Sequence, residues 1–313
     1  MTRTAIGLAA LALGLASMLA ALPAHAQPAR VFVSGSGNDS NPCTVAAPCR
    51  SFQQAFNSVA AGGEIDVLDT AGYGPLDITH AVSIQGHGMG SISGPNNANA
   101  ITVNAGYSDT ILLNGLLLDG SGNGLDGVDV ITAGSVQILD CVIRHFAAYG
   151  IDFEPAYATL FAVSNTITSD NGIVGIVIEP QPGGDNSSIS LDKITATGNG
   201  ITFGNGFPLF TGLGLYIAIA AVMVSESNLS NNGNGVFIAG GALMAKNNVM
   251  SNNSAGFGLA TTDSIVWLTK NAISGNSVGV SITGGTANSY GDNDISGNIS
   301  TDVSGTLTPV MTQ

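Results

Sequence analysis

One short unit, a glycine followed by an apolar, a variable and a second apolar residue, recurs along this sequence and constrains its fold most strongly. Its copies begin at Gly127 ("GVDV"), Gly150 ("GIDF"), Gly175 ("GIVI"), Gly214 ("GLYI"), Gly235 ("GVFI"), Gly256 ("GFGL") and Gly279 ("GVSI"). Successive copies start 23, 25, 39, 21, 21 and 23 residues apart, so one long interval interrupts a narrow period. Such a period is typical of solenoids, in which each repeat buries its apolar side chains against its neighbours.

Two further elements follow each unit in phase. The first is a second apolar strand, such as "SVQIL", "LFAVS", "AVMVS" or "IVWLT". The other is an Asn-rich segment, such as "SNTITSDNG" or "KNNVMSNN", in which a third short strand lies between two bends. Asparagine and glycine tolerate the left-handed backbone conformation that tight bends between strands require. Three short strands and three bends in each repeat predict one coil of a parallel β-helix.

On these repeats the chain resembles the right-handed parallel β-helix proteins of the pectin-lyase-like superfamily, of the secreted bacterial type, over roughly Ile65 to Ser300. Before that region, Phe52, Ala55, Phe56 and Val59 have the spacing of an amphipathic helix. The resemblance implies that this helix caps the N-terminal end of the solenoid. We therefore expect an all-β fold with a strand, a disulfide loop and a capping helix in residues 27–62, a β-helix in 63–300 and a tail in 301–313.

The first 26 residues have the layout of a secretory signal peptide. Arg3 precedes an uncharged Ala/Leu-rich stretch at residues 5–22, and the small-residue cleavage signal Ala-His-Ala follows at residues 24–26. We expect a secreted or periplasmic protein, in which Cys43 and Cys49 form a disulfide. Cys141 lies in the apolar run "VQILDCVI" and is predicted to be a buried free thiol.

The charge balance excludes several classes of partner. Removal of the signal peptide leaves six Lys and Arg against 21 Asp and Glu, a formal net charge of −15. Such a chain repels nucleic acid and anionic membranes, and it repels polyanionic sugars unless a cation mediates. With only 9% charged and 44% hydrophobic residues, however, the chain is not a disordered acidic one.

An uncharged run of 18 residues, 207–224, begins in the long interval and continues into the next repeat. Its length is at the threshold for a membrane span, but Pro208, Gly212 and Gly214 interrupt it, and its second half keeps the repeat phase. We interpret it as buried strands plus a protruding loop, not as a membrane span. Residues 201–214 form the insertion, whose structure the sequence does not indicate, with Phe207, Leu209 and Phe210 as candidates for an exposed apolar contact. A monomer is expected.

The repeat phase assigns each side chain to the inside or the outside, because successive residues of a strand point to opposite faces. Outward positions on consecutive coils are Asp129, Asp152, Val177, Tyr216 and Phe237, and the next outward positions include Glu154 and Glu179. Since stacked strands lie ~4.8 Å apart, the four acids are predicted to form one patch, with Asp152 and Glu154 accessible to solvent. The inward positions, predicted to be buried, are Ile151, Phe153, Ile176, Ile178, Val236, Ile238, Val280 and Ile282.

Closely spaced carboxylates raise one another's pKa, which suits acid–base chemistry, and carboxyl separations of ~5–9.5 Å are those used to cleave glycosides. The candidate catalytic residues are therefore Asp129, Asp152 and Glu154. Resemblance to pectate-lyase-like enzymes, in which acids hold calcium and an arginine is the base, adds Arg144 as the candidate lyase base. It also makes Asp129 and Asp152 candidate calcium ligands, with calcium as the one cofactor considered. Glu179, Tyr216 and Phe237 are the candidate substrate-binding residues.

Two other family motifs match in part. "GHG" at residues 86–88 resembles a polygalacturonase motif but lacks its acidic and basic companions, so it is interpreted as a turn. "YGID" at residues 149–152 resembles the start of the mannuronan epimerase motif. The match then fails, because Glu154 stands where that motif has its catalytic histidine.

These patterns predict an exported protein that binds a polysaccharide or cell-surface glycan on an acidic and aromatic face. If it is an enzyme, it is a polysaccharide lyase or a glycoside hydrolase. The alternative is a non-catalytic surface, structural or adhesion protein, whose outward acids only keep the repeat soluble. The short bends favour this alternative, because a catalytic face needs loops that wall a cleft, so whether the protein is an enzyme stays open at this point.

Overall fold

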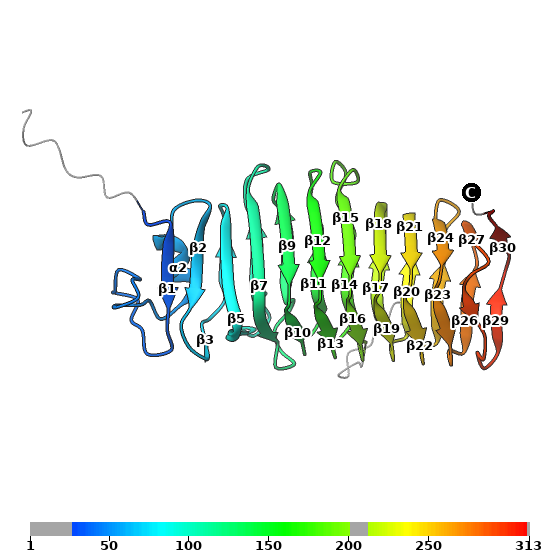
Figure 1. Ribbon diagram of the computed structural model, residues 1–313, viewed down its shortest axis with the longest axis horizontal. Helices are drawn as coiled ribbons and strands as arrows, with labels where there is room; N and C mark the ends of the chain where they lie inside the picture. Colours follow the sequence, from blue (N-terminus) through cyan, green and yellow to red (C-terminus); the bar gives the residue numbers. More distant parts are fainter. Residues whose placement is uncertain (1–26, 201–211, 312–313) are drawn as a thin grey trace, which may run out of the picture.

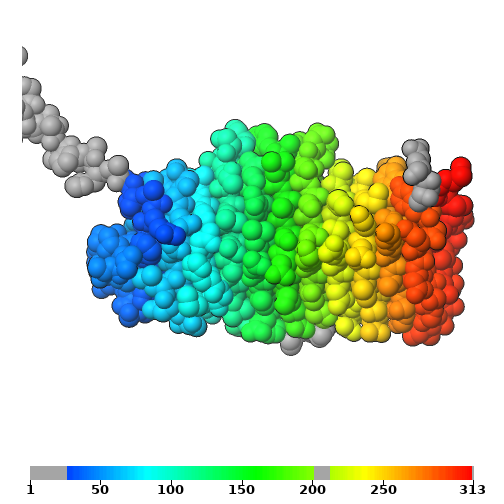
Figure 2. All heavy atoms as spheres, in the orientation of Figure 1, coloured from blue at the N-terminus to red at the C-terminus, as the bar shows by residue number. Residues whose placement is uncertain are grey.

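The computed structural model describes residues 27–200 and 212–311, which stack as coils into an elongated rod (Figures 1 and 2). The strands of successive coils pair in parallel, which confirms the predicted parallel β-helix. The predicted signal peptide and residues 201–211 of the predicted insertion, with Phe207, Leu209 and Phe210, lie outside the described residues.

One side of the rod is a ten-stranded sheet formed by the Gly–apolar–x–apolar units and their irregular relatives at both ends. Its strands are β4 (Leu76–Ile78), β6 (Ile101–Asn104), β8 (Val128–Thr132), β11 (Tyr149–Phe153), β14 (Val174–Ile178), β17 (Leu213–Ile217), β20 (Asn234–Ile238), β23 (Ala255–Leu259), β26 (Val278–Ile282) and β29 (Thr301–Ser304).

The remaining strands form a twenty-stranded sheet with two arms, which join at the long strands β5 (Val82–Ser93) and β7 (Thr110–Asp119). The long arm continues with β1 (Arg30–Val33), β2 (Gly63–Val67), β9 (Ser135–Leu139), β12 (Leu160–Ser164), β15 (Ser188–Asp192), β18 (Ala220–Ser225), β21 (Gly241–Lys246), β24 (Ile265–Thr269), β27 (Thr286–Ser289) and β30 (Leu307–Pro309). The short arm comprises β3 (Ala71–Gly72), β10 (Val142–Arg144), β13 (Ile167–Ser169), β16 (Thr195–Thr197), β19 (Asn228–Ser230), β22 (Val249–Ser251), β25 (Ala272–Ser274) and β28 (Asp294–Ile295).

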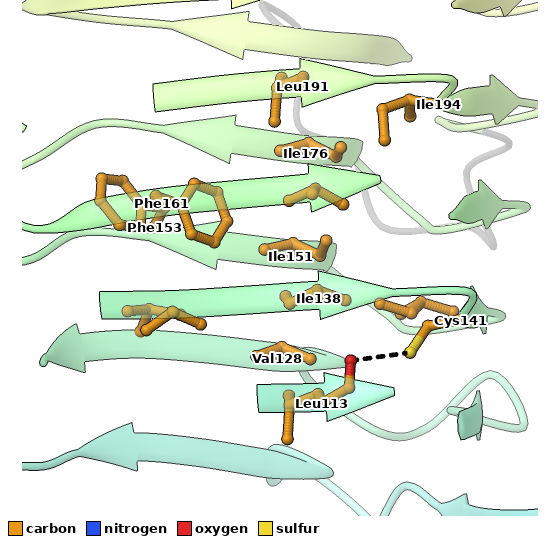
Figure 3. Packing of buried hydrophobic residues seen from close by; sticks show 14 of the residues in the cluster. Leu113, Val128, Ile138, Cys141, Ile151, Phe153, Phe161, Ile176, Leu191 and Ile194 are labelled. Carbon is orange, nitrogen blue, oxygen red and sulfur yellow. Dashed lines mark hydrogen bonds between the residues drawn. The ribbon is translucent and has the colours of Figure 1, made fainter. Parts of the chain in front are cut away.

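The interior is filled by apolar side chains that stack in rows along the rod (Figure 3). Phe153 of β11 and Phe161 of β12 stack face to face across the interior, with ring centroids 4.3 Å apart. Seven of the eight predicted inward residues are buried, and the exception, Ile282, is only half-buried. Ile282 lies at the end of β26, where the register with β29 stops at Ser281, so no further inward side chain covers it.

A line of asparagines, all buried except the half-buried Asn298, runs along the rod at the bends. The line comprises Asn171, Asn199, Asn232, Asn253, Asn276 and Asn298. The Oδ1 atom of each asparagine accepts the backbone N–H of the equivalent residue on the preceding coil at 2.8 to 3.2 Å. The first donor is Phe146, and the N–H of Asn298 donates to the carboxylate of Asp302 at 3.1 Å. These bonds satisfy backbone donors at bends, where the strand ladder is interrupted. We call this line the asparagine ladder.

The N-terminal end follows the predicted plan. The helix α2 (Phe52–Ser58) begins after Ser51, whose hydroxyl accepts from Gln54 N, and it buries Phe52, Ala55 and Phe56. Cys43 and Cys49 form the expected disulfide in the loop between β1 and α2. Cys141 is buried and free, and its thiol donates to the carbonyl oxygen of Leu139 at 3.1 Å. Among residues 27–200 and 212–311, no helix is long and apolar enough to span a membrane.

The C-terminal boundary predicted at Ser300 needs a correction. The β-helix continues through residue 309, because β29 pairs with β26 and β30 pairs with β27. The sequence "TDVSG" of this coil lacks the first apolar residue of the repeat unit, so only Val303 marks its inward face. A coil at the end of a stack has one neighbour and therefore needs fewer inward apolar residues.

Candidate functional site

The outward row of the ten-stranded sheet is continuous over many coils, as the repeat phase predicts. Asp129 on β8 is in direct register with Asp152 on β11, and Asp152 is in register with Val177 on β14. The row continues through Tyr216 and Phe237, whose rings stack at a centroid distance of 6.2 Å. The prediction that Asp129 is the neighbour of Asp152 on the preceding coil is confirmed.

The carboxylates are more buried than the sequence predicts. Asp129 is only 9% exposed, while Asp152 and Glu154 are half-buried. The Oδ1 atoms of Asp129 and Asp152 are both buried without a hydrogen-bond partner among the described residues, and Asp129 Oδ2 accepts from Asn99 Nδ2 at 2.8 Å. The expectation of solvated acids is therefore corrected: Asp152 and Glu154 reach solvent only in part.

An apolar cluster lies next to Asp152 on the same outward face, where Val177 is its register partner. Val174, Val177 and Leu213 are each 3% exposed although they lie outside the core, and Tyr149, Ile173, Tyr216 and Phe237 pack against them. The outward face thus changes from acidic at β8 and β11 to apolar at β14 and β17. Apolar neighbours withdraw water from the carboxylates, which disfavours their charged form.

Asp126, which the sequence analysis missed, belongs to the same group. It is 6% exposed in the turn before β8, and its Oδ1 accepts the backbone N–H of Tyr149 at 2.9 Å. Asp126 precedes the glycine of the repeat unit, so the repeat phase assigns it to no outward position. The only signal in the sequence is its place three residues before Asp129 in "DGVD".

Burial and like charge separate the pKa values of these acids. Burial, followed by the charges of Asp126 and Glu154, raises the pKa of Asp152 to about 8. Burial and then Glu154 raise the pKa of Asp129 to about 6, although the hydrogen bond from Asn99 opposes this. Burial also raises the pKa of Asp126 to about 6. At neutral pH, Asp152 therefore holds a proton next to Asp129, which is mostly ionised.

Glu154, Glu179 and Tyr149 complete the group. Burial and the neighbouring Glu154 raise the pKa of Glu179, and Gln181 Nε2 donates to Glu154 Oε2 at 3.4 Å. Burial and the charge of Asp152 raise the pKa of Tyr149 to about 12, so its hydroxyl stays protonated. We call Asp126, Asp129, Tyr149, Asp152, Glu154 and Glu179 the acidic site.

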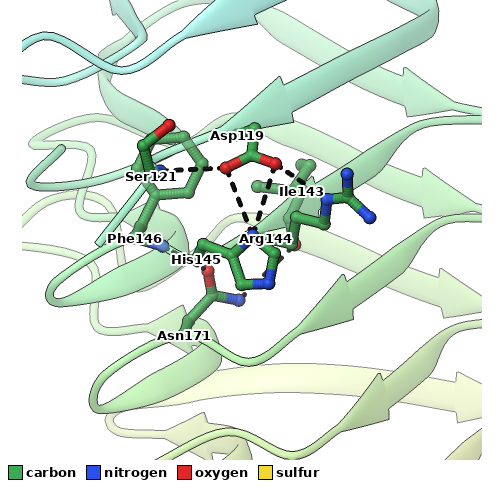
Figure 4. Close-up of polar contacts among 7 residues, drawn as sticks. All are labelled: Asp119, Ser121, Ile143, Arg144, His145, Phe146 and Asn171. Atoms are coloured by element: carbon green, nitrogen blue, oxygen red, sulfur yellow. Dashed lines mark hydrogen bonds and ion pairs between the residues drawn. The ribbon is translucent and has the colours of Figure 1, made fainter. Parts of the chain in front are cut away.

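Arg144 has a salt-bridge partner outside the acidic site. It ends β10 in the short arm, and its Nε donates to Asp119 Oδ2 at 3.0 Å (Figure 4). The same carboxylate accepts from Ser121 N at 2.9 Å and bonds His145 Nδ1 at 3.2 Å. Backbone and side-chain donors together hold the pKa of Asp119 below its ordinary value despite partial burial, which acts against them. Arg144 thus contacts Asp119, and no contact joins it to Asp129 or Asp152 among the described residues.

The "GHG" segment lies inside a strand and not in a turn between strands. His87 has a left-handed backbone conformation within β5, where the register with β7 shifts between Gln85 and Gly90. Its Nε2 bonds Asp66 Oδ1 at 3.1 Å, and Asp66 also pairs with Arg30. The segment is therefore a bulge whose histidine bonds a carboxylate, which corrects the interpretation as a simple turn.

The acidic site does not fit a calcium ion. Calcium takes six to eight oxygen ligands. In the part of the chain that the structure describes, no three His, Cys, Asp or Glu side chains are arranged so that they could hold a metal ion. The candidate ligands Asp129 and Asp152 supply only two carboxylates, so no step below depends on calcium.

Comparison with known proteins identifies the fold. No protein-family model matches the chain, and no curated protein matches its sequence. The pectate lyase Pel9A matches with a TM-score of 0.60 at 15% identity, over 90% of this chain and 77% of its own. An alginate lyase from a Paenibacillus species matches with a TM-score of 0.53 at 14% identity, over 89% and 99%. The A-module of the mannuronan C-5 epimerase AlgE6 from Azotobacter vinelandii matches with a TM-score of 0.50 at 16% identity, over 83% and 94%. At these identities the likeness shows the fold alone: the chain shares the parallel β-helix of these three proteins.

Proposed function

We propose that this exported protein binds a polysaccharide across the outward face of β8, β11 and β14 and cleaves it by acid–base catalysis. One observation carries the proposal: Asp129 and Asp152 lie in direct register, and each has a buried carboxylate oxygen without a partner among the described residues. Buried polar atoms of native proteins almost always have partners, and exceptions point to a functional site.

In this proposal the two aspartates have different roles because their environments separate their pKa values. Asp152 is protonated at neutral pH and donates its proton to the leaving oxygen of a glycosidic bond. Asp129 is mostly ionised and attacks the anomeric carbon as the glycosidic bond breaks. Water, which loses a proton to Asp152, then releases the sugar from Asp129. Adjacent strands lie ~4.8 Å apart, which places the two carboxyl groups near the lower end of the ~5–9.5 Å range used in glycoside cleavage.

Neighbouring side chains would bind the sugar chain. Tyr216 and Phe237 offer stacked rings in the same outward row, and Glu154 and Glu179 lie one outward position further along their strands. The fold supports a polysaccharide substrate, since the similar solved structures include a pectate lyase and an alginate lyase. Arg144 has no role in this mechanism, because Asp119 holds it.

The test compares two aspartates of one outward row. Asp77 on β4 precedes Thr102 and Asp129 in the row but is exposed, so Asp77→Asn is a matched control for Asp152→Asn. Purified protein is incubated with pectate, alginate and neutral polysaccharides, and new chain ends and binding are measured separately. We expect cleavage of one polysaccharide, which Asp152→Asn abolishes and Asp77→Asn preserves.

Two results would count against the proposal. Binding without cleavage by the unmodified protein would favour the non-catalytic surface or adhesion protein. Cleavage that persists in Asp152→Asn would place the chemistry elsewhere on the rod.

A further inference from the structure

We propose that a groove on the outward face of the long arm is a second polysaccharide site, which binds an acidic sugar chain through Trp267 and two lysines. This site lies on a different sheet from the acidic site, and the proposal does not depend on the cleavage proposed above. The evidence is the position of the lysines, the lining of the groove and the charge of the rest of the molecule.

All three lysines of the sequence lie at one bend of the rod. Lys193 follows β15, Lys246 ends β21 and Lys270 follows β24, so the three lie at the bend between the long and short arms of their coils. The bend also carries Asp192, Glu226 and Asp292, so its cations lie among carboxylates. On a chain with a formal net charge of −14, a polyanion nevertheless meets more cations here than on most of the surface.

The three lysines differ in their ion pairs. Lys193 forms ion pairs with Asp192 at 3.3 Å and Glu226 at 3.7 Å. Neither Lys246 nor Lys270 forms an ion pair within the part of the chain that the structure describes, and both are exposed. Together with Glu226 they line a cavity of about 310 Å³ that reaches Met223.

Met223 also lines a larger groove, of about 610 Å³, over the adjoining outward face of the long arm. Its floor is a row in direct register, Met223 on β18, Met244 on β21 and Trp267 on β24. Met223 is 43% exposed, and Met244, Trp267 and Tyr290 are half-buried. The groove thus presents broad apolar and aromatic surface next to the two unpaired lysines.

The row also carries polar groups at both ends. Ser190 on β15 is in register with Met223, and Asn288 on β27 is in register with Trp267. From β15 to β27 the row crosses four strand spacings, about 19 Å. Because the solenoid repeats similar positions at each coil, such a groove matches a polymer of repeating units better than a compact ligand.

The lining indicates an acidic sugar chain as the occupant. Flat aromatic and thioether side chains suit the apolar faces of pyranose rings, while a few polar groups fix orientation. Lys246 lies two residues after Met244 on the same strand, so its ammonium group can reach a carboxylate on a sugar that packs against the row. A neutral chain would leave both lysines without partners.

Trp267 is the only tryptophan of the sequence, so its fluorescence reports this groove directly. The experiment titrates the mature protein with oligomers of pectate and alginate and, separately, with neutral dextran. We expect a saturable change of emission with an acidic oligomer that weakens steeply with salt, and no change with dextran. In Lys246→Gln/Lys270→Gln the affinity is expected to fall about tenfold.

Lys193→Gln is the matched control, because Lys193 is already paired with Asp192 and Glu226; its affinity is expected to equal that of the unmodified protein. Asp152→Asn is expected to leave the titration unchanged, which separates this site from the acidic site. Unchanged emission with both acidic oligomers would overturn the proposal. Equal affinity in the double variant, or equal binding of dextran, would also overturn it.

Discussion

Asp152 shows at the residue scale how an ordinary strand position acquires unusual chemistry. Its backbone belongs to a regular ladder, with partners Asp129 and Val177 on either side. One partner brings like charge and the other brings apolar surface, and both disfavour the ionised carboxylate. Burial raises the pKa of Asp152 most, and the charges of Asp126 and of Glu154, two residues further along the chain, add to it, so no special backbone geometry at Asp152 is needed.

This environment predicts how stability depends on pH. A carboxyl group whose pKa is higher in the folded chain stabilises the fold fully below its ordinary pKa of 3.8, and that contribution is lost as the pH rises towards 8. We expect Asp152→Asn to remove this loss, so that its melting temperature exceeds that of the unmodified protein at pH 9 and nearly equals it at pH 4. Thermal unfolding across this pH range measures the effect, with the exposed Asp77→Asn as control. Parallel curves for Asp152→Asn and the unmodified protein would show that Asp152 ionises normally.

At the scale of elements, the bends are as ordered as the strands. Two residues in most coils adopt the left-handed conformation, as Asn247 and Asn252 do on either side of β22. The asparagine ladder satisfies the backbone donors that these bends leave without a strand partner. Lys193, Glu226 and Lys270 occupy left-handed positions equivalent to that of Asn247, so these bends place charged side chains on the surface.

Asn253 tests the ladder. It is 4% exposed, its Oδ1 accepts Asn232 N at 2.8 Å, and its Nδ2 donates to Leu229 O at 3.0 Å. We expect Asn253→Ala to lower the free energy of unfolding by about 2 kcal/mol, because it leaves a buried donor and a buried acceptor unpaired. Denaturant unfolding measures this change. Asn234→Ala in the half-buried first position of β20 is the comparison, and a similar loss in both variants would mean that the ladder has no special role.

On the scale of the whole molecule, the rod has two different ends. The helix α2 covers the first coils, whereas the last coil, β28 to β30, ends the stack with half-buried Ile295 and Leu307. An uncovered coil presents strand edges and partly exposed core, which favour association between chains.

Truncation separates the last coil from the residues after it. A chain that stops at Ser300 loses β29 and β30 and exposes β26 and β27 along their whole length. We expect it to melt at a lower temperature and to associate, as light scattering and size-exclusion chromatography would show. A chain that stops at Pro309 keeps both strands and is expected to behave like the full chain. Equal behaviour of the two truncations would mean that the last coil contributes little.

The sequence predicts the fold well because the repeat unit is local. The phase of seven glycines places Ile151 inside and stacks Asp129 on Asp152, and both placements are confirmed. It does not predict the burial of Asp129, because that burial depends on residues outside its own strand, such as Asn99, which donates to its carboxylate. Asp126 was missed since it lies in a bend, where the phase assigns no direction. The salt bridge between Arg144 and Asp119 joins two strand ends that are 25 residues apart in the sequence. It could not be predicted without the register between β10 and β7.

The asparagine ladder also limits how a protein like this one can change its length in evolution. Each rung accepts from the coil before it and donates to the coil after it, and Asp302 ends the series. A deletion of a few residues next to a ladder asparagine would break the series of hydrogen bonds. After the loss or duplication of one whole coil, the coils that become neighbours can form the same hydrogen bonds. We therefore expect homologues to differ mainly in steps of a coil.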